Sequence, residues 1–294
     1  MKNKIVKNLL SLSVVTLMIS CGGEPAIDDN IDVNDNDTLV EVEVEEDIFG
    51  ESPDEDYHLP SALQVASIFK KSGVNYNAGV ANSTDNVQNY TSELQQKLNF
   101  GVYSADLAYC VTNEQSNEAR KYITAIQDLA EAQGMEAVFD NKDLMDRFDK
   151  NLENSDSVES IMIEIHERTE EYMDDNDLTH TSAIHYAGAW VEGMYLGFYD
   201  YEHSNEKKNI GAQITEQMEI LKNIIKGLKD PKNNGINLEE TISDLENIQN
   251  TFDNFESVKK YNTDEDAAEL VLSDEEIKTI GNLIKDIRAK IVNA

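Results

Sequence analysis

From Leu59 to Ala294, apolar residues recur at every third or fourth position, and only two prolines, Pro60 and Pro231, interrupt the pattern. Such a spacing places apolar side chains on one face of an α-helix, and a proline inside a helix removes a backbone hydrogen bond. The pattern therefore predicts an all-α fold, a multi-helix bundle of about nine or ten helices. Residues 59–203 are expected to form a helical domain, and residues 204–294 a C-terminal three-helix unit packed on it.

The limits of the helices are predicted from breakers and capping residues. Gly73 is expected to end the first short helix, which begins at Pro60. Ser273 with Glu276 has the spacing of a capping box and would begin the last helix, and Asn237 is expected to be the N-cap of the helix before it. The other predicted spans are 84–99, 101–111, 114–133, shorter helices within 135–151, 156–175, 179–201, 206–229 and 238–258.

The span 179–201 is the most apolar of the predicted helices and could be mistaken for a membrane span. It contains His185 and Glu192, and the helices on both sides of it have the polar faces of helices in water. Both features favour a central buried helix of a globular body.

Acidic residues dominate the charge: 58 Asp and Glu against 24 Lys and Arg give a formal net charge of -34 at pH 7. The phosphate backbone of nucleic acid repels such a surface, so nucleic acid is excluded as the expected partner. Residues 21–58 carry 15 of the acids and no Lys or Arg. This segment has too little apolar surface to fold alone, so we expect a disordered and extended acidic tether.

Residues 1–20 have the layout of a secretory signal, with three lysines before an apolar run that ends at Ile19. The motif Met18-Ile19-Ser20-Cys21 resembles the lipobox of bacterial lipoproteins. The resemblance implies that the signal is removed before Cys21, that diacylglycerol is attached to the Cys21 thiol, and that this lipid anchors the chain to a membrane. The alternative is an ordinary cleaved signal with a chance cysteine.

Two stretches of the body, residues 101–110 and 187–195, look like parts of uncharacterised all-helical envelope lipoproteins of Gram-negative bacteria. This resemblance implies a helical fold and no particular activity. Gly22 follows the cysteine, where retention in the inner membrane would require Asp, so the outer membrane is the expected location by analogy with that sorting rule.

Asp106 and Glu192 are the two acids set deepest in small, aromatic-rich segments of the predicted helices. If the two helices touch, the carboxyl groups could share a proton or a cation, as an acid/base pair does. The candidate pocket also includes the neighbouring residues Tyr103, Tyr109, His185, Trp190 and Tyr195. The alternative is that a tyrosine hydroxyl, a lysine or a backbone group satisfies each carboxylate.

No metal site and no cofactor are predicted. The segment beginning at His166 matches the helix of zinc proteases until its last position, where Glu170 stands in place of the required His. His185 and Glu192 are two helical turns apart, about 10 Å along the axis, which is too far for one ion. If Cys21 is lipidated, Cys110 is the only remaining thiol, and we expect it to be buried and inert.

Two functions remain open on these grounds. The first is a membrane-anchored envelope lipoprotein that acts as a non-catalytic helical scaffold or as a module that could bind another envelope protein. The alternative is a small-ligand binder or an enzyme with a pocket around Asp106 and Glu192.

Overall fold

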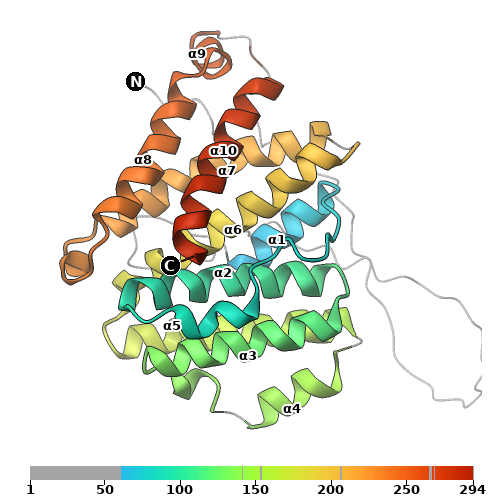
Figure 1. Cartoon of the computed structure of the whole chain (residues 1–294), viewed down its shortest axis with the longest axis vertical. Helices are drawn as coiled ribbons and strands as arrows, with labels where there is room; N and C mark the ends of the chain where they lie inside the picture. The colour runs from blue at the N-terminus through green and yellow to red at the C-terminus, as the bar shows by residue number, and fades with distance from the viewer. Residues whose placement is uncertain are drawn as a thin grey trace, which may run out of the picture. The chain divides into compact units, whose positions relative to one another are not determined.

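The computed structural model describes residues 61–140, 142–152, 154–205, 207–264, 267 and 269–293. Every regular element within these ranges is a helix, with no strand among them, which confirms the all-α prediction (Figure 1). The signal, Cys21 and the acidic segment lie outside the described residues. None of the helices in the described ranges is long and apolar enough to cross a membrane.

The α-helices are α1 (Ala62–Lys71), α2 (Glu93–Thr112), α3 (Ser116–Ala132), α4 (Lys142–Lys150), α5 (Ser155–Asp175), α6 (Ser182–His203), α7 (Lys207–Leu228), α8 (Glu239–Asn254), α9 (Glu256–Thr263) and α10 (Asp274–Val292). Four short 3₁₀ helices connect them in the described residues: η1 (Thr84–Asn89), η2 (Glu136–Val138), η3 (Thr179–Thr181) and η4 (Pro231–Gly235).

The region between residues 84 and 112 differs from the prediction. Residues 84–89 form η1, and a single α2 runs through the break expected between the predicted helices 84–99 and 101–111. A capping box between Ser92 and Gln95 starts α2, since each side chain bonds to the backbone N–H of the other residue. Gly101 lies inside α2 and does not mark a helix end. It has no side chain, so the backbone of α6 can approach α2 at this position.

Two further predictions of helix limits are wrong. The helix expected over 238–258 is divided into α8 and α9 at Phe255, whose backbone is extended with φ -60° and ψ 147°. Asn237 is not the N-cap of α8, because Leu238 occupies that position and offers no side-chain acceptor. The capping box of Ser273 and Glu276 at the start of α10 is confirmed, and Glu276 also accepts a hydrogen bond from Ser257 on α9.

The apolar side chains form two core clusters, and α2 contributes to both. One cluster joins α1, α2 and α6 to α7, α8 and α10. The other joins the opposite face of α2 to α3, α4 and α5. Residues on both sides of the boundary expected at 203/204 therefore share one core. Helix α6 is buried along most of its length, which confirms the prediction of a central buried helix.

Candidate functional site

The backbones of α2 and α6 are in direct contact where a glycine of each helix faces the other. A Cβ atom on Gly101 would lie 1.8 Å from the backbone oxygen of His185, and a Cβ atom on Gly188 would lie 1.9 Å from the backbone oxygen of Leu98. Only glycine permits such an approach, because any side chain would overlap the backbone of the other helix.

This close crossing brings Asp106 and Glu192 together. Asp106 follows Gly101 by five residues on α2, and Glu192 follows Gly188 by four residues on α6. Both residues are fully buried, with 0% of their surface exposed. The two carboxyl groups are near enough for Glu192 to raise the pKa of Asp106.

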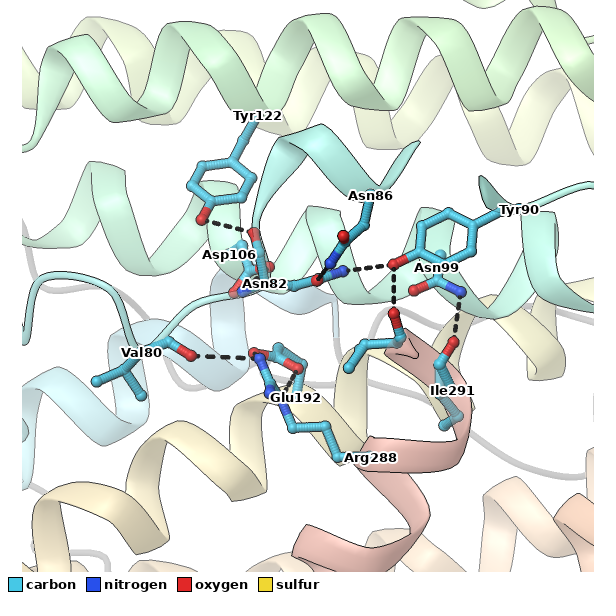
Figure 2. Close-up of polar contacts among 11 residues, drawn as sticks. Val80, Asn82, Asn86, Tyr90, Asn99, Asp106, Tyr122, Glu192, Arg288 and Ile291 are labelled. Atoms are coloured by element: carbon cyan, nitrogen blue, oxygen red, sulfur yellow. Dashed lines mark hydrogen bonds and ion pairs between the residues drawn. The ribbon is translucent and has the colours of Figure 1, made fainter. Parts of the chain in front are cut away.

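Glu192 forms a two-pronged ion pair with Arg288, which comes from α10. The Nε and Nη2 atoms of Arg288 donate to Oε2 and Oε1 of Glu192 at 2.6 and 2.8 Å (Figure 2). Nη2 also donates to the backbone oxygen of Val80 at 3.3 Å, and the guanidinium group lies 3.9 Å from the ring centre of Tyr195. Planar pairing of this kind is the strongest form of carboxylate recognition by arginine, and here it joins α6 to α10.

Asp106 has a less complete set of partners. Its Oδ2 atom accepts the backbone N–H of Asn82 at 3.2 Å, whereas Oδ1 has no hydrogen-bond donor in the described part of the chain. Burial raises the pKa of Asp106 well above its usual value, and the charge of Glu192 raises it further, while Arg288 acts in the opposite direction. Burial therefore favours the neutral form of the Asp106 carboxyl group.

A polar network extends from this cluster to the end of α10 (Figure 2). The Asn82 side chain donates to the Tyr90 hydroxyl at 2.9 Å, and that hydroxyl donates to the backbone oxygen of Val292 at 3.1 Å. Asn99 donates to the backbone oxygen of Ile291 at 3.0 Å. Because the last carbonyl groups of a helix have no partner within it, these two bonds satisfy the end of α10.

The five other residues of the expected pocket do not line one cavity. Tyr195 alone lies on the ion pair, beneath Arg288. The other four are hydrogen-bonded to separate parts of the body: Tyr103 donates to the backbone oxygen of Ser83, Tyr109 to that of Asn75, Trp190 to that of Gln217, and His185 pairs with the Gln133 side chain.

His185 is a structural residue in this arrangement. Its Nε2 atom lies 3.0 Å from Oε1 of Gln133, and its ring packs on Phe100 at 4.7 Å between ring centres. Burial lowers the pKa of His185 to about 3, and the nearby charge of Lys97 acts in the same direction. Its imidazole is therefore neutral at pH 7. Cys110 is buried as expected, and burial raises the pKa of its thiol.

Arg288 and Asn82 are the parts of the cluster that sequence reasoning missed. Arg288 follows Ile284 by four residues, on the apolar stripe that also includes Ile280 and Ile291. A charged residue on such a stripe requires a buried counter-charge, and this was the available signal. Asn82 gave none, because it belongs to an irregular loop and binds Asp106 through its backbone.

The cavities found among the described residues lie elsewhere. A cavity of about 20 Å³ lies under α1, between α2 and α6, and its lining is mostly apolar. A groove of about 530 Å³ lies beside the α2–α3 turn and the start of α5, lined by residues that include Glu114, Ser116, Leu152 and Asp156. Asp106 and Glu192 line neither of them. No group of three or more metal-binding side chains occurs in the described ranges.

Comparison of this chain with protein-family models, with characterised proteins and with solved structures yields no match. The functional assignment therefore depends on the chemistry of these side chains. The cluster joins three helices, and neither of the cavities found among the described residues reaches its two carboxyl groups.

Proposed function

We propose that this protein is a membrane-anchored envelope lipoprotein whose helical body is a non-catalytic scaffold or binding module. The observation that carries this proposal is the burial and pairing of Asp106 and Glu192. These are the two carboxyl groups best suited to acid/base chemistry, and they are used instead to join α2, α6 and α10.

Catalysis by the acid pair would require contact with a substrate. Both residues are 0% exposed, and both oxygens of Glu192 are held by Arg288. A general acid or base must come within hydrogen-bond distance of the proton that it transfers, either directly or through one water molecule. This geometry favours the scaffold over the enzyme.

The anchor is supported by the sequence at Cys21. Each buried CH₂ group of an acyl chain contributes about 0.8 kcal/mol to membrane binding, so one chain gives marginal binding and several chains give stable anchoring. The 15 acids of residues 21–58 repel one another and an anionic membrane surface. An anchor with such a tether would hold the helical body away from the bilayer.

We expect Cys21→Ser to move the protein from the membrane fraction to the soluble fraction, because the serine hydroxyl cannot take the thioether-linked lipid. The measurement is cell fractionation with detergent extraction, together with the mass of the N-terminal peptide. Cys110→Ala is the matched control, since it removes the other cysteine and should leave the protein in the membrane fraction. A Cys21→Ser protein that still required detergent for extraction would contradict the anchor.

The non-catalytic body predicts that Asp106→Asn preserves function in cells. Asparagine has the shape of the neutral acid and accepts the same Asn82 hydrogen bond, but it cannot transfer a proton. The measurement is complementation of a strain that lacks the protein, scored by growth and envelope integrity at matched protein levels. Loss of complementation by a folded Asp106→Asn protein would favour the alternative, an enzyme or ligand binder that uses this acid.

A further inference from the structure

The strongest unexplained feature of the body is a mismatch of charge around Arg288. Two carboxyl groups, Asp106 and Glu192, are sealed in the cluster with one guanidinium group. If both carboxyl groups were ionised, the cluster would have an uncompensated negative charge on two fully buried side chains. Such a charge is costly to bury, and two adjacent carboxylates seldom ionise together.

In the part of the chain that the structure describes, Arg288 is the one cation that acts on Asp106. The titratable groups of the described residues that interact with Asp106 lie on several elements: Glu192 on α6, Arg288 on α10, Tyr103 and Cys110 on α2, Tyr122 on α3, and Tyr76 and Tyr90 in the connecting segments. Arg288 is the only positive charge in this set, and Glu192 already occupies it in two-pronged geometry.

The hydrogen bonds point in the same direction. Oδ1 of Asp106 is buried without a donor, and the carboxyl group beside it, Glu192, is itself an acceptor. Two carboxyl groups can form a hydrogen bond only if one of them has a proton. A proton on Oδ1 of Asp106 would let that atom donate to Glu192 and would remove the excess negative charge.

We infer that Asp106 and Glu192 hold one proton between them in the folded protein, and that loss of this proton loosens the end of α10. A chain of hydrogen bonds connects Asp106 to the end of α10. Asn82 binds Asp106 through its backbone and Tyr90 through its side chain, and Tyr90 in turn binds the backbone oxygen of Val292. When Asp106 ionises, Arg288 is shared between two carboxylates that repel each other. The ion pair between Arg288 and Glu192 is then weaker.

The direction of the pH effect follows from the two states of Asp106. Its pKa is raised in the folded protein above the ordinary value of 3.8, so between these two pKa values the folded state holds a proton that the unfolded state has lost. The stabilisation is complete below pH 3.8 and is lost as the pH rises through the pKa of the folded protein. Within that window, each pH unit changes the unfolding equilibrium constant up to tenfold.

His185 changes the stability with pH in the opposite direction, so its contribution must be distinguished from that of Asp106. Its pKa falls from 6.5 to about 3 on folding, so its contribution to stability is lost as the pH falls through that range. The unfolding constant of the wild type divided by that of Asp106→Asn cancels the His185 effect, because both proteins retain this histidine.

The test compares urea unfolding of the full-length wild type and Asp106→Asn from about pH 5 to about pH 9. We expect this ratio of unfolding constants to rise by up to tenfold per pH unit until Asp106 is ionised. Hydrogen exchange in residues 288–293, corrected for intrinsic rates, should accelerate with pH in the wild type and not in the variant. A ratio that is constant with pH would overturn the inference.

Asp200→Asn is the matched control. Asp200 is also a buried acid on α6 with a pKa raised by burial, but its side chain is bound by Asn77 and not by α10. This variant should leave the pH-dependent exchange of residues 288–293 as it is in the wild type. If Asp200→Asn also abolished the pH-dependent acceleration of hydrogen exchange in residues 288–293, the effect would be general to buried acids, and the local coupling would be overturned.

Infrared spectroscopy of the wild type keeps the inference testable if Asp106→Asn fails to fold. We expect the carbonyl band of a buried, protonated carboxyl group at neutral pH, which disappears on alkaline titration together with the protection of residues 288–293. A wild-type protein at neutral pH without such a band would contradict the shared proton.

Discussion

Gly188→Ala is expected to lower the free energy of unfolding by at least about 3 kcal/mol, the upper end of the range for overpacked cores. The added Cβ atom would lie 1.9 Å from the backbone oxygen of Leu98, so α2 and α6 would have to separate. Separation would also disturb the pairing of Asp106 with Glu192. The measurement is chemical denaturation followed by circular dichroism, and Gly101→Ala should behave in the same way, since its Cβ atom would meet the backbone oxygen of His185.

Gly193→Ala is the matched control on the same helix. Its added Cβ atom would meet only the flexible side chain of Val65, at 3.0 Å. Alanine also favours a helix over glycine by about 1 kcal/mol, which offsets the tight contact. The control should therefore unfold near the wild-type midpoint. A Gly188→Ala protein within about 1 kcal/mol of the wild type would show that the helix crossing is looser than the structure has it.

Arg288→Met is expected to lower the free energy of unfolding by about 3–5 kcal/mol, the cost of breaking a buried ion pair from one side. Methionine fills much of the space of the arginine stem but leaves Asp106 and Glu192 buried without a cation. Because protonation removes the orphaned charge, the deficit should shrink as the pH is lowered. The measurement is denaturant unfolding at several pH values. If the loss of unfolding free energy in Arg288→Met did not change with pH, its cause would be the loss of packing and not the loss of the positive charge.

Lys285→Met is the control for removing a cation from α10. Lys285 pairs with Glu202 at 2.8 Å, but its side chain is 37% exposed, whereas that of Arg288 is 13% exposed. Exposed pairs contribute about 0–1 kcal/mol, because water and salt screen them. A small effect of Lys285→Met beside a large effect of Arg288→Met would assign the difference to burial. Equal effects would contradict the role given to the cluster.

Local patterns predicted the helices well where one helix was bounded by clear signals. The capping box at Ser273 and the central buried helix around Glu192 are both found. The break predicted between residues 99 and 101 is wrong, because α2 continues through it and Gly101 admits the backbone of α6 there. The division of the 238–258 span at Phe255 also lacked a signal, because no proline or glycine marks it.

The candidate site shows the same limit. Asp106 and Glu192 were recognisable as acids in apolar segments, because the pattern around each of them is local. The partners that decide their chemistry are Arg288, which follows Glu192 by 96 residues, and the backbone of Asn82. Tyr109, Trp190 and His185 looked equally suited to a pocket, but each is bound to a different neighbour in the folded chain.

The sequence by itself determined the helical class of the body, the acidic character of the chain and the presence of two acids where apolar side chains were expected. Helix periodicity and composition are local properties, so they can be read from neighbouring residues. Only the tertiary structure decided that these acids lie close together and that Arg288 of α10 pairs with Glu192. Such pairings depend on the close packing of α2 and α6 at Gly101 and Gly188 and on the approach of α10, which no single segment encodes.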